Sequence, residues 1–164
     1  MADRPGIDEG KFDEIMGFSK DVIDDALGGG GRVYFTGHLA RPQEKLGHYE
    51  EFSVESGMTY HEVFKTETPH VHSFNSDVNY VVSGALKVVL LDRGIEQEVE
   101  AGGIFFFPPG VPHVVKAKPG TRVLFVKSPG GDDKQVIASD KLPEGFATWA
   151  SDYNTPWDGS CIAG

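Results

Sequence analysis

Residues 69–84 read Pro-His-Val-His-Ser-Phe-Asn-Ser-Asp-Val-Asn-Tyr-Val-Val-Ser-Gly, and this stretch decides the fold that we expect for the chain. Valine, tyrosine and phenylalanine are interleaved with small polar residues, a pattern typical of β-strands. Alternate residues of a strand point to the same face, so the side chains of His70 and His72 should lie on one side, about 6.6–6.8 Å apart along the chain. At that separation both imidazoles can reach one metal ion, and a carboxylate on the next strand could supply a third ligand.

A second stretch, residues 102–113, also points to a metal site. It contains a glycine, five residues and then Pro-Pro-Gly-Val-Pro-His, so that a rigid turn delivers His113 to the start of a strand. A His-x-His pair alone is weak evidence, since it arises by chance about 0.2 times in a chain with this histidine content. The His-x-His pair is followed by an acid at Asp77, a glycine at Gly84 and the second stretch. This combination is too specific to arise by chance.

With these two stretches the chain resembles the cupin superfamily. The first is similar to the family's His-x-His pair, three or four residues, an acid, six residues and a glycine, and the second to Gly-x5-Pro-x-Gly-x2-His-x3-Asn. The resemblance implies an all-β fold, an antiparallel double-stranded β-helix or jelly-roll barrel. It also implies one divalent metal ion held by four residues: His70, His72, Asp77 and His113.

Three positions depart from the family pattern. Phe64 stands where the family has a glycine, and Ala117 replaces the final asparagine of the second motif. Asp77 stands where glutamate is usual. Because its side chain is one methylene shorter, it must approach the metal more closely, bind it through water, or instead hydrogen-bond a ligand histidine.

The composition fits one globular, turn-rich β domain. The chain has 164 residues, of which 39% are hydrophobic, with 21 glycines and 10 prolines. A net charge of −10 argues against nucleic-acid binding, which needs a basic surface. The sequence has no apolar run of membrane-spanning length and no signal peptide at its start, and a single cysteine excludes an internal disulfide. We expect a cytoplasmic protein that contacts neither membrane nor nucleic acid.

The chain divides into an N-terminal helix with a glycine-rich linker (1–31), the barrel (32–128) and an aromatic tail (129–164). Within the barrel, short alternating or apolar runs separated by turn residues predict strands near residues 32–37, 48–54, 58–65, 77–82, 85–91, 95–100, 104–107 and 121–127. Two more are expected, one carrying the His-x-His pair and one that starts at His113. We expect hairpin turns at residues 55–57 and 92–94.

Apolar residues at helical spacing predict an amphipathic helix over residues 8–27. Asp8 is its expected N-cap, and the glycines of residues 28–31 end it. The helix either packs on the barrel or forms a dimer contact. The tail, with its four large aromatic residues, packs on the barrel, covers its mouth, or is exchanged between subunits. Both segments carry apolar surface that needs a partner, so we expect a homodimer.

Three further residues are candidates for catalysis. His61 lies on the strand before the first motif and could face the pocket, and Lys65 has the same strand parity. Either could act as a general base. Asn79 shares the parity of Asp77 and is a candidate hydrogen-bond donor in the pocket. Phe105 or Phe107 should supply an apolar wall.

The implied ligand set leaves a divalent ion with net positive charge and open positions. Such an ion can bind dioxygen, polarise a carbonyl or activate water, and iron, manganese, nickel and zinc all fit. We therefore favour a metal-dependent enzyme that acts on a small polar organic molecule, with dioxygenase chemistry first. Sugar isomerase, epimerase or lyase chemistry is the alternative, as is a cupin that binds a small molecule without catalysis.

Overall fold

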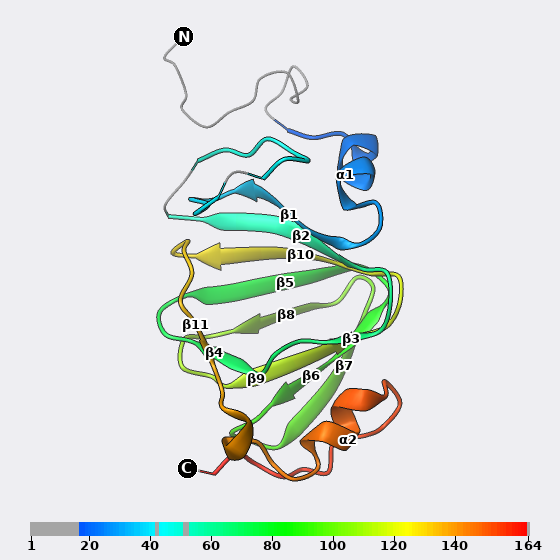
Figure 1. Cartoon of the computed structure of the whole chain (residues 1–164), viewed down its shortest axis with the longest axis vertical. Coiled ribbons are helices and arrows are strands. Elements are labelled where there is room, and N and C mark those ends of the chain that lie inside the picture. Colours follow the sequence, from blue (N-terminus) through cyan, green and yellow to red (C-terminus); the bar gives the residue numbers. More distant parts are fainter. Residues whose placement is uncertain (1–16, 42, 51–52, 164) are drawn as a thin grey trace.

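Two antiparallel β-sheets form the body of the molecule in this computed structural model, which describes residues 17–41, 43–50 and 53–163 (Figure 1). The first sheet has the spatial order β1 (Gly31–Thr36), β2 (Glu55–His61), β10 (Thr121–Ser128), β5 (Ser76–Ser83) and β8 (Ile104–Phe107). The second has the order β11 (Lys134–Val136), β4 (His70–His72), β9 (His113–Ala117), β6 (Ala85–Leu90) and β7 (Ile95–Glu100), and β3 (Lys65–Thr66) also pairs with β9. The predicted all-β jelly-roll architecture is confirmed.

Alternation of buried and exposed residues, clearest on β5, places the core between the sheets. On β5, Asp77, Asn79 and Val81 are buried, whereas the residues between them are exposed. The inward apolar side chains of both sheets form one cluster: Val81, Leu86, Val88, Val99, Phe107, Val115, Ala117 and Val123. Burying each of the larger side chains stabilises the fold by about 1.5–3 kcal/mol. This cluster therefore supplies much of the hydrophobic stabilisation that holds the two sheets together.

Helix α1 (Lys20–Leu27) is shorter than predicted. Its N-cap is Ser19, whose Oγ accepts a hydrogen bond from the Val22 N–H, and residues 17–19 are not helical. The rest of the predicted helix, with Asp8, lies outside the described residues. Leu27 packs with Val33 and Leu46, so α1 covers the β1–β2 side of the first sheet, and Gly29 to Gly31 then turn at positive φ into β1 (Figure 1).

Strand β2 (Glu55–His61) begins within residues 55–57, where we predicted a hairpin turn, and it ends before the predicted limit at residue 65. A Cβ on Gly57 would lie 2.2 Å from the Val33 carbonyl oxygen and 2.6 Å from the Phe125 ring, so this glycine permits close packing within the sheet and makes no turn. The strand predicted over residues 48–54 was also wrong: Tyr49 forms an isolated bridge with Thr36, and 51–52 lie outside the described residues.

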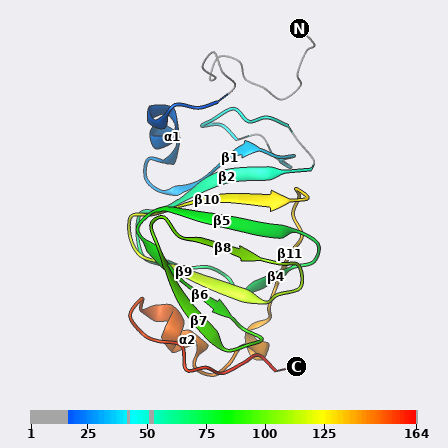
Figure 2. The same ribbon diagram turned by 180° about the vertical axis from the view of Figure 1, so that it is seen from behind.

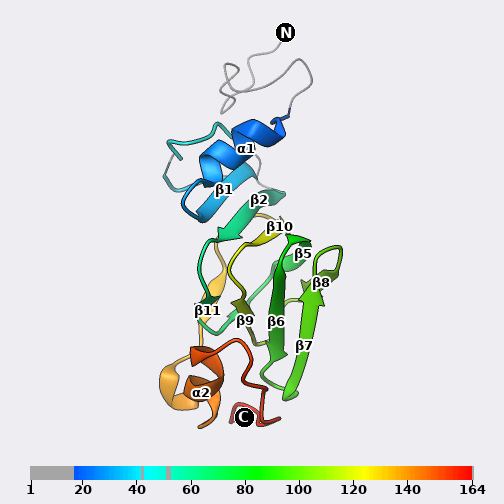
Figure 3. The same cartoon turned by 90° about the vertical axis from the view of Figure 1, so that its right-hand side faces the viewer.

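The tail packs on its own barrel, at the end of the molecule opposite α1 (Figure 3). It contains β11, a short 3-10 helix (Ser139–Lys141) and α2 (Phe146–Ser151). Trp149 of α2 is buried with Val89, Leu91 and Val114. Lys116, fully buried, donates three hydrogen bonds of 2.7–2.9 Å to tail carbonyls, which satisfies all three N–H groups of its ammonium. In the described ranges no helix has the length and apolar character needed to cross a membrane.

Candidate metal centre

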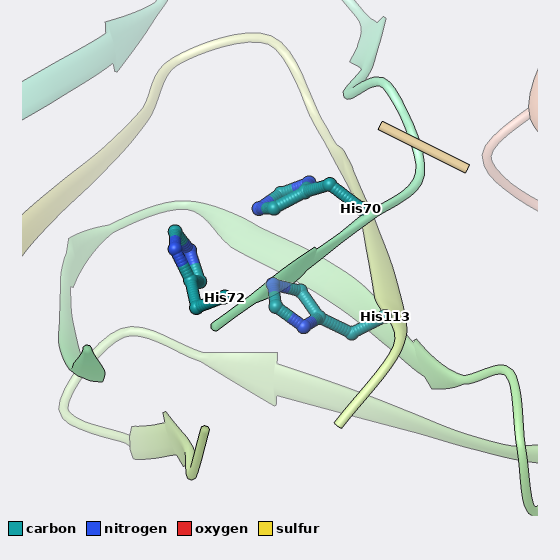
Figure 4. Close-up of side chains that lie close together, drawn as sticks. All are labelled: His70, His72 and His113. Atoms are coloured by element: carbon teal, nitrogen blue, oxygen red, sulfur yellow. The ribbon is translucent and has the colours of Figure 1, made fainter. Parts of the chain in front are cut away.

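Three histidines from two neighbouring strands point toward one another (Figure 4). His70 and His72 are the two inward residues of β4, and His113 is the register partner of His70 at the start of β9. The ring centroids lie 5.0 Å apart for His70 and His72, and 4.4 Å apart for His70 and His113. One nitrogen from each ring lies within 4.8 Å of the other two, so the group could hold one metal ion.

The hydrogen bonds of the three rings fix which nitrogen faces the centre. Nδ1 of His70 is 2.7 Å from the Thr68 carbonyl oxygen, and Nδ1 of His113 is 2.8 Å from that of Val111. Since a carbonyl only accepts, each Nδ1 must carry the proton, which leaves the lone pair on Nε2. In His72, Nδ1 donates to the Asp133 carboxylate at 2.7 Å. All three Nε2 atoms are therefore prepared as metal ligands.

Burial keeps His70 and His113 neutral near pH 7. It lowers the pKa of His70 to about 4, and burial together with the neighbouring His70 lowers the pKa of His113 to about 3. Both imidazoles are uncharged near pH 7, as a metal ligand must be. The His113 ring also stacks on Phe107, with centroids 3.5 Å apart and planes 7° from parallel, which restrains its orientation.

Asp77 lies beside this group without being part of it. Its Oδ2 is 3.7 Å from Nε2 of His72, and its Oδ1 is buried with no hydrogen-bond donor among the described residues. Burial raises the pKa of the Asp77 carboxyl against the opposing effect of Lys127. A buried carboxylate oxygen without a donor needs a compensating cation, so the environment of Asp77 fits a metal ligand.

Asp133 is a functional residue that sequence reasoning missed. Its Oδ1 accepts from His72, and its Oδ2 accepts from the backbone N–H groups of Phe74 and Asn75 at 2.9 and 2.8 Å. Burial alone would raise the pKa of this carboxyl, but these three donors lower it below its ordinary value. Asp133 lies in a segment with no motif spacing, so no local signal in the sequence could have identified it.

The histidines border a cavity of about 60 Å³. Its apolar walls are Leu86, Phe105, Phe107, Val115, Val123 and Phe125, so both phenylalanines proposed as pocket walls are present. Its polar lining includes Thr59, Glu67 and the cations Arg32, Lys127 and Lys134, none of which carries a motif. The space accommodates an ion and a few small-molecule atoms.

The three candidate catalytic residues fall into two groups. His61 and Asn79 are buried and line the cavity. Lys65 is exposed on β3 and lines a neighbouring depression instead. The parity that linked Lys65 to His61 is lost because β2 ends at His61 and the chain bends at Glu62 and Val63 before β3 begins.

Comparisons with known proteins found one family match and several similar solved structures. The family model for the cupin domain matches residues 56–126. Similar solved structures include KdgF from a Halomonas species, with 24% identity over 65% of this chain and 84% of that chain, at a TM-score of 0.49. An RmlC-like cupin from Shewanella frigidimarina NCIMB 400 has 25% identity over 65% of this chain and 81% of that chain, at a TM-score of 0.49.

The crystal structures of the DMSP lyases RdDddP and RnDddQII provide a third match, with 19% identity over 66% of this chain and 53% of that chain. Its TM-score of 0.51 supports the fold alone at that identity. A search of curated proteins found no match to this chain.

Proposed function

We propose, from the premise that residues 56–126 form a cupin domain, that this protein is a metal-dependent enzyme acting on a small polar organic molecule. His70, His72 and His113 would hold the metal, with Asp77 as the fourth ligand. One observation carries the proposal: each of the three imidazoles is bonded through Nδ1, so that three Nε2 lone pairs are left for one centre.

The donor set fits a divalent transition metal. Three neutral imidazoles and one carboxylate suit iron, manganese, nickel or zinc, and the buried Oδ1 of Asp77 has no hydrogen-bond donor within the described ranges. Such an ion would supply Lewis acidity and, where it is redox-active, reactivity toward dioxygen.

The walls of the cavity favour dioxygenase-type chemistry. Phe105, Phe107 and Phe125 surround the space beside the histidines and keep water away from reactive species formed from oxygen. Asn79 offers an amide donor that can orient a polar group of the substrate.

A specific observation favours a second candidate, an isomerase, epimerase or lyase. His61 lines the same cavity, and burial lowers its pKa, so that the ring is neutral near pH 7 and can accept a proton. In this reaction His61 would remove the proton next to a carbonyl that the metal polarises.

Metal analysis of protein purified without chelator tests the first step. We expect one divalent ion per chain, lost in His113→Ala with little change in the β signal of circular dichroism. His48→Ala, a histidine outside the site, is the matched control and should retain the metal. Unchanged metal content in His113→Ala would refute the site.

Two assays on the metal-loaded protein then separate the reactions. Oxygen uptake with a panel of catechols, thiols and keto acids, absent in His113→Ala, would support the dioxygenase. Oxygen-independent exchange of substrate hydrogen with deuterium oxide, lost in His61→Gln, would support the second candidate. If the protein binds one metal ion per chain but shows neither activity, the proposal of catalysis is refuted. The alternative of a cupin that binds a small molecule without catalysis would then stand. The cytoplasmic location and the homodimer stay predictions.

A further inference from the structure

We propose that the mouth of the cavity recognises a carboxylate, so that the substrate is a small organic acid. Arg32 and Lys134 would hold the carboxylate, while Asn79 inside the cavity would donate a hydrogen bond to a second polar group next to the histidines. This inference rests on the proposed function, because it names the substrate class of the same site.

Arg32 and Lys134 occupy the entrance. Both line the inner cavity of about 60 Å³ and also two outer depressions of about 560 and 470 Å³. Arg32 lies on β1, at the start of the barrel, and Lys134 lies on β11, in the tail. A ligand that moves from either depression toward the histidines therefore passes both positive charges.

The guanidinium of Arg32 is oriented but has no carboxylate partner. Its Nε donates to the Thr59 hydroxyl at 3.0 Å, and its Cζ lies 4.7 Å from the centre of the Phe125 ring. The Tyr34 side chain also hydrogen-bonds the guanidinium. The remaining terminal N–H groups can meet the oxygens of a carboxylate. In the part of the chain that the structure describes, neither Arg32 nor Lys134 has an ion pair, whereas Lys127 at the same cavity is paired with Glu55 at 3.2 Å.

Asn79 supplies an independent observation deeper in the site. Its side chain is only 8% exposed, and its Nδ2 has no hydrogen-bond acceptor within the described residues. It lies on β5 opposite Phe125 and Phe105, so that aromatic walls flank it on both sides. A buried amide donor without an acceptor calls for a ligand oxygen at that position.

The local charges also favour an anion. Glu67 lines the same entrance and offsets one of the two positive charges. One net positive charge remains there, and a divalent ion at the histidines adds to it even after Asp77 is counted. The chain as a whole carries a charge of −10, so this region has the opposite sign to the rest of the molecule. The small inner space with its apolar walls fits a short-chain acid.

Isothermal titration calorimetry of the metal-loaded protein tests this proposal. The probes are malonate, succinate and glutarate, each matched with the monocarboxylate of equal carbon number. We expect at least one dicarboxylate to bind about tenfold or more tightly than its match, since only the dicarboxylate can engage the entrance and the centre together. Arg32→Gln and Lys134→Gln should each weaken that binding about tenfold.

Lys65→Gln is the matched control, because Lys65 lines an outer depression without lining the inner cavity. It should bind the dicarboxylate like the parent protein. Equal binding of dicarboxylates and monocarboxylates, no effect of Arg32→Gln and Lys134→Gln, or an equal loss in Lys65→Gln would each overturn the proposal. Metal content is measured in the same samples. A parent protein without metal would refute the proposed function, whereas full metal content with no dicarboxylate preference would refute this inference alone.

Discussion

At the scale of single residues, the site depends on how each imidazole is held. The His72 ring receives its orientation from Asp133, a carboxylate 61 positions away that also binds two backbone N–H groups. The other two rings use nearby carbonyls, only two residues away in each case. The His72 ring is therefore the one ligand whose orientation depends on a distant segment.

Removing the Asp133 carboxylate should weaken metal binding. Asp133→Asn can present its amide NH₂ to Nδ1 of His72, which would shift the ring proton to Nε2 and block the ligand atom. We expect the metal Kd to rise about 10–100-fold, as measured by competition with a chelator. Asp132→Asn, on an exposed neighbour, is the matched control, and an equal effect there would contradict the role of Asp133.

Whether Asp77 is a metal ligand can be tested by changing the charge and the length of its side chain. Asp77→Asn removes the carboxylate and should weaken metal binding, whereas Asp77→Glu should be tolerated, because glutamate reaches further and resembles the family pattern. Chelator competition again measures the Kd. Full affinity in Asp77→Asn would exclude Asp77 as a ligand.

The buried histidines predict a pH dependence for the metal-free protein. Burial lowers the pKa of His70 to about 4 and that of His113 to about 3, from 6.5. As pH falls below about 6.5, the unfolded chain binds protons that the folded protein does not. The free energy of unfolding should therefore fall between about pH 6.5 and pH 4, by at most about 1.4 kcal/mol per pH unit for each histidine.

Urea unfolding at pH 7.5, 6 and 5 measures this effect, and His113→Gln should flatten the slope. A stability that stays constant or rises over this range in the metal-free protein would contradict the prediction.

At the scale of elements, two three-residue strands, β4 and β11, are central to the site. β4 is three residues long and lies between β9 and β11, with His70 in register with His113 on one side and Val136 on the other. β11 comes from the tail and lies directly after Asp133. The tail thus contributes a strand and a histidine partner to the metal centre, besides its aromatic packing on the barrel.

The close packing around Gly57 in β2 predicts that a larger residue at this position destabilises the fold. Alanine there would place its Cβ against the Val33 carbonyl oxygen, which is part of the sheet and cannot withdraw. We expect Gly57→Ala to lower the free energy of unfolding by about 1–3 kcal/mol in urea denaturation. Val63→Ala, at an exposed bend just after β2, should change stability little. Equal stability of Gly57→Ala and the parent would show that the sheet can open at this point.

At the scale of the whole molecule, both segments outside the barrel pack on it. α1 covers β1 and β2, and α2 is buried against residues of β6 and β9. Among the described residues, five exposed apolar side chains gather on the outward face of β5 and β8, where β8 is the edge of its sheet (Figure 2). This face consists of Val78, Tyr80, Val82, Ile104 and Phe106.

The predicted homodimer should therefore form through this face. A second copy offers the same uncharged strand pair, so the contact is self-complementary and closes with two-fold symmetry. Phe106→Glu should shift the protein toward monomer in sedimentation equilibrium at micromolar concentration. Val136→Glu is the control, since Val136 is 63% exposed and Phe106 is 65% exposed. A monomeric parent would refute the dimer, and an unchanged dimer in Phe106→Glu would move the interface elsewhere.

The sequence by itself determined the barrel and the three histidines. Strand periodicity, turn glycines and the spacing within residues 69–84 and 102–113 are local properties, and they place His70 and His72 on one face whatever the rest of the chain does. The same local rules failed at Gly57 and Lys65, where packing against β1 and a bend after β2 override strand parity.

Only the tertiary structure decided what surrounds the histidines. Asp133, Arg32 and Lys134 carry no motif. Asp133 reaches His72, and Arg32 and Lys134 reach the cavity, because β1 and β11 take positions in the two sheets that depend on long-range pairing. Register between distant strands follows from the packing of the whole core, which short-range periodicity does not encode. The residue types that could hold a metal were thus readable from sequence, whereas the charges that would select a substrate were not.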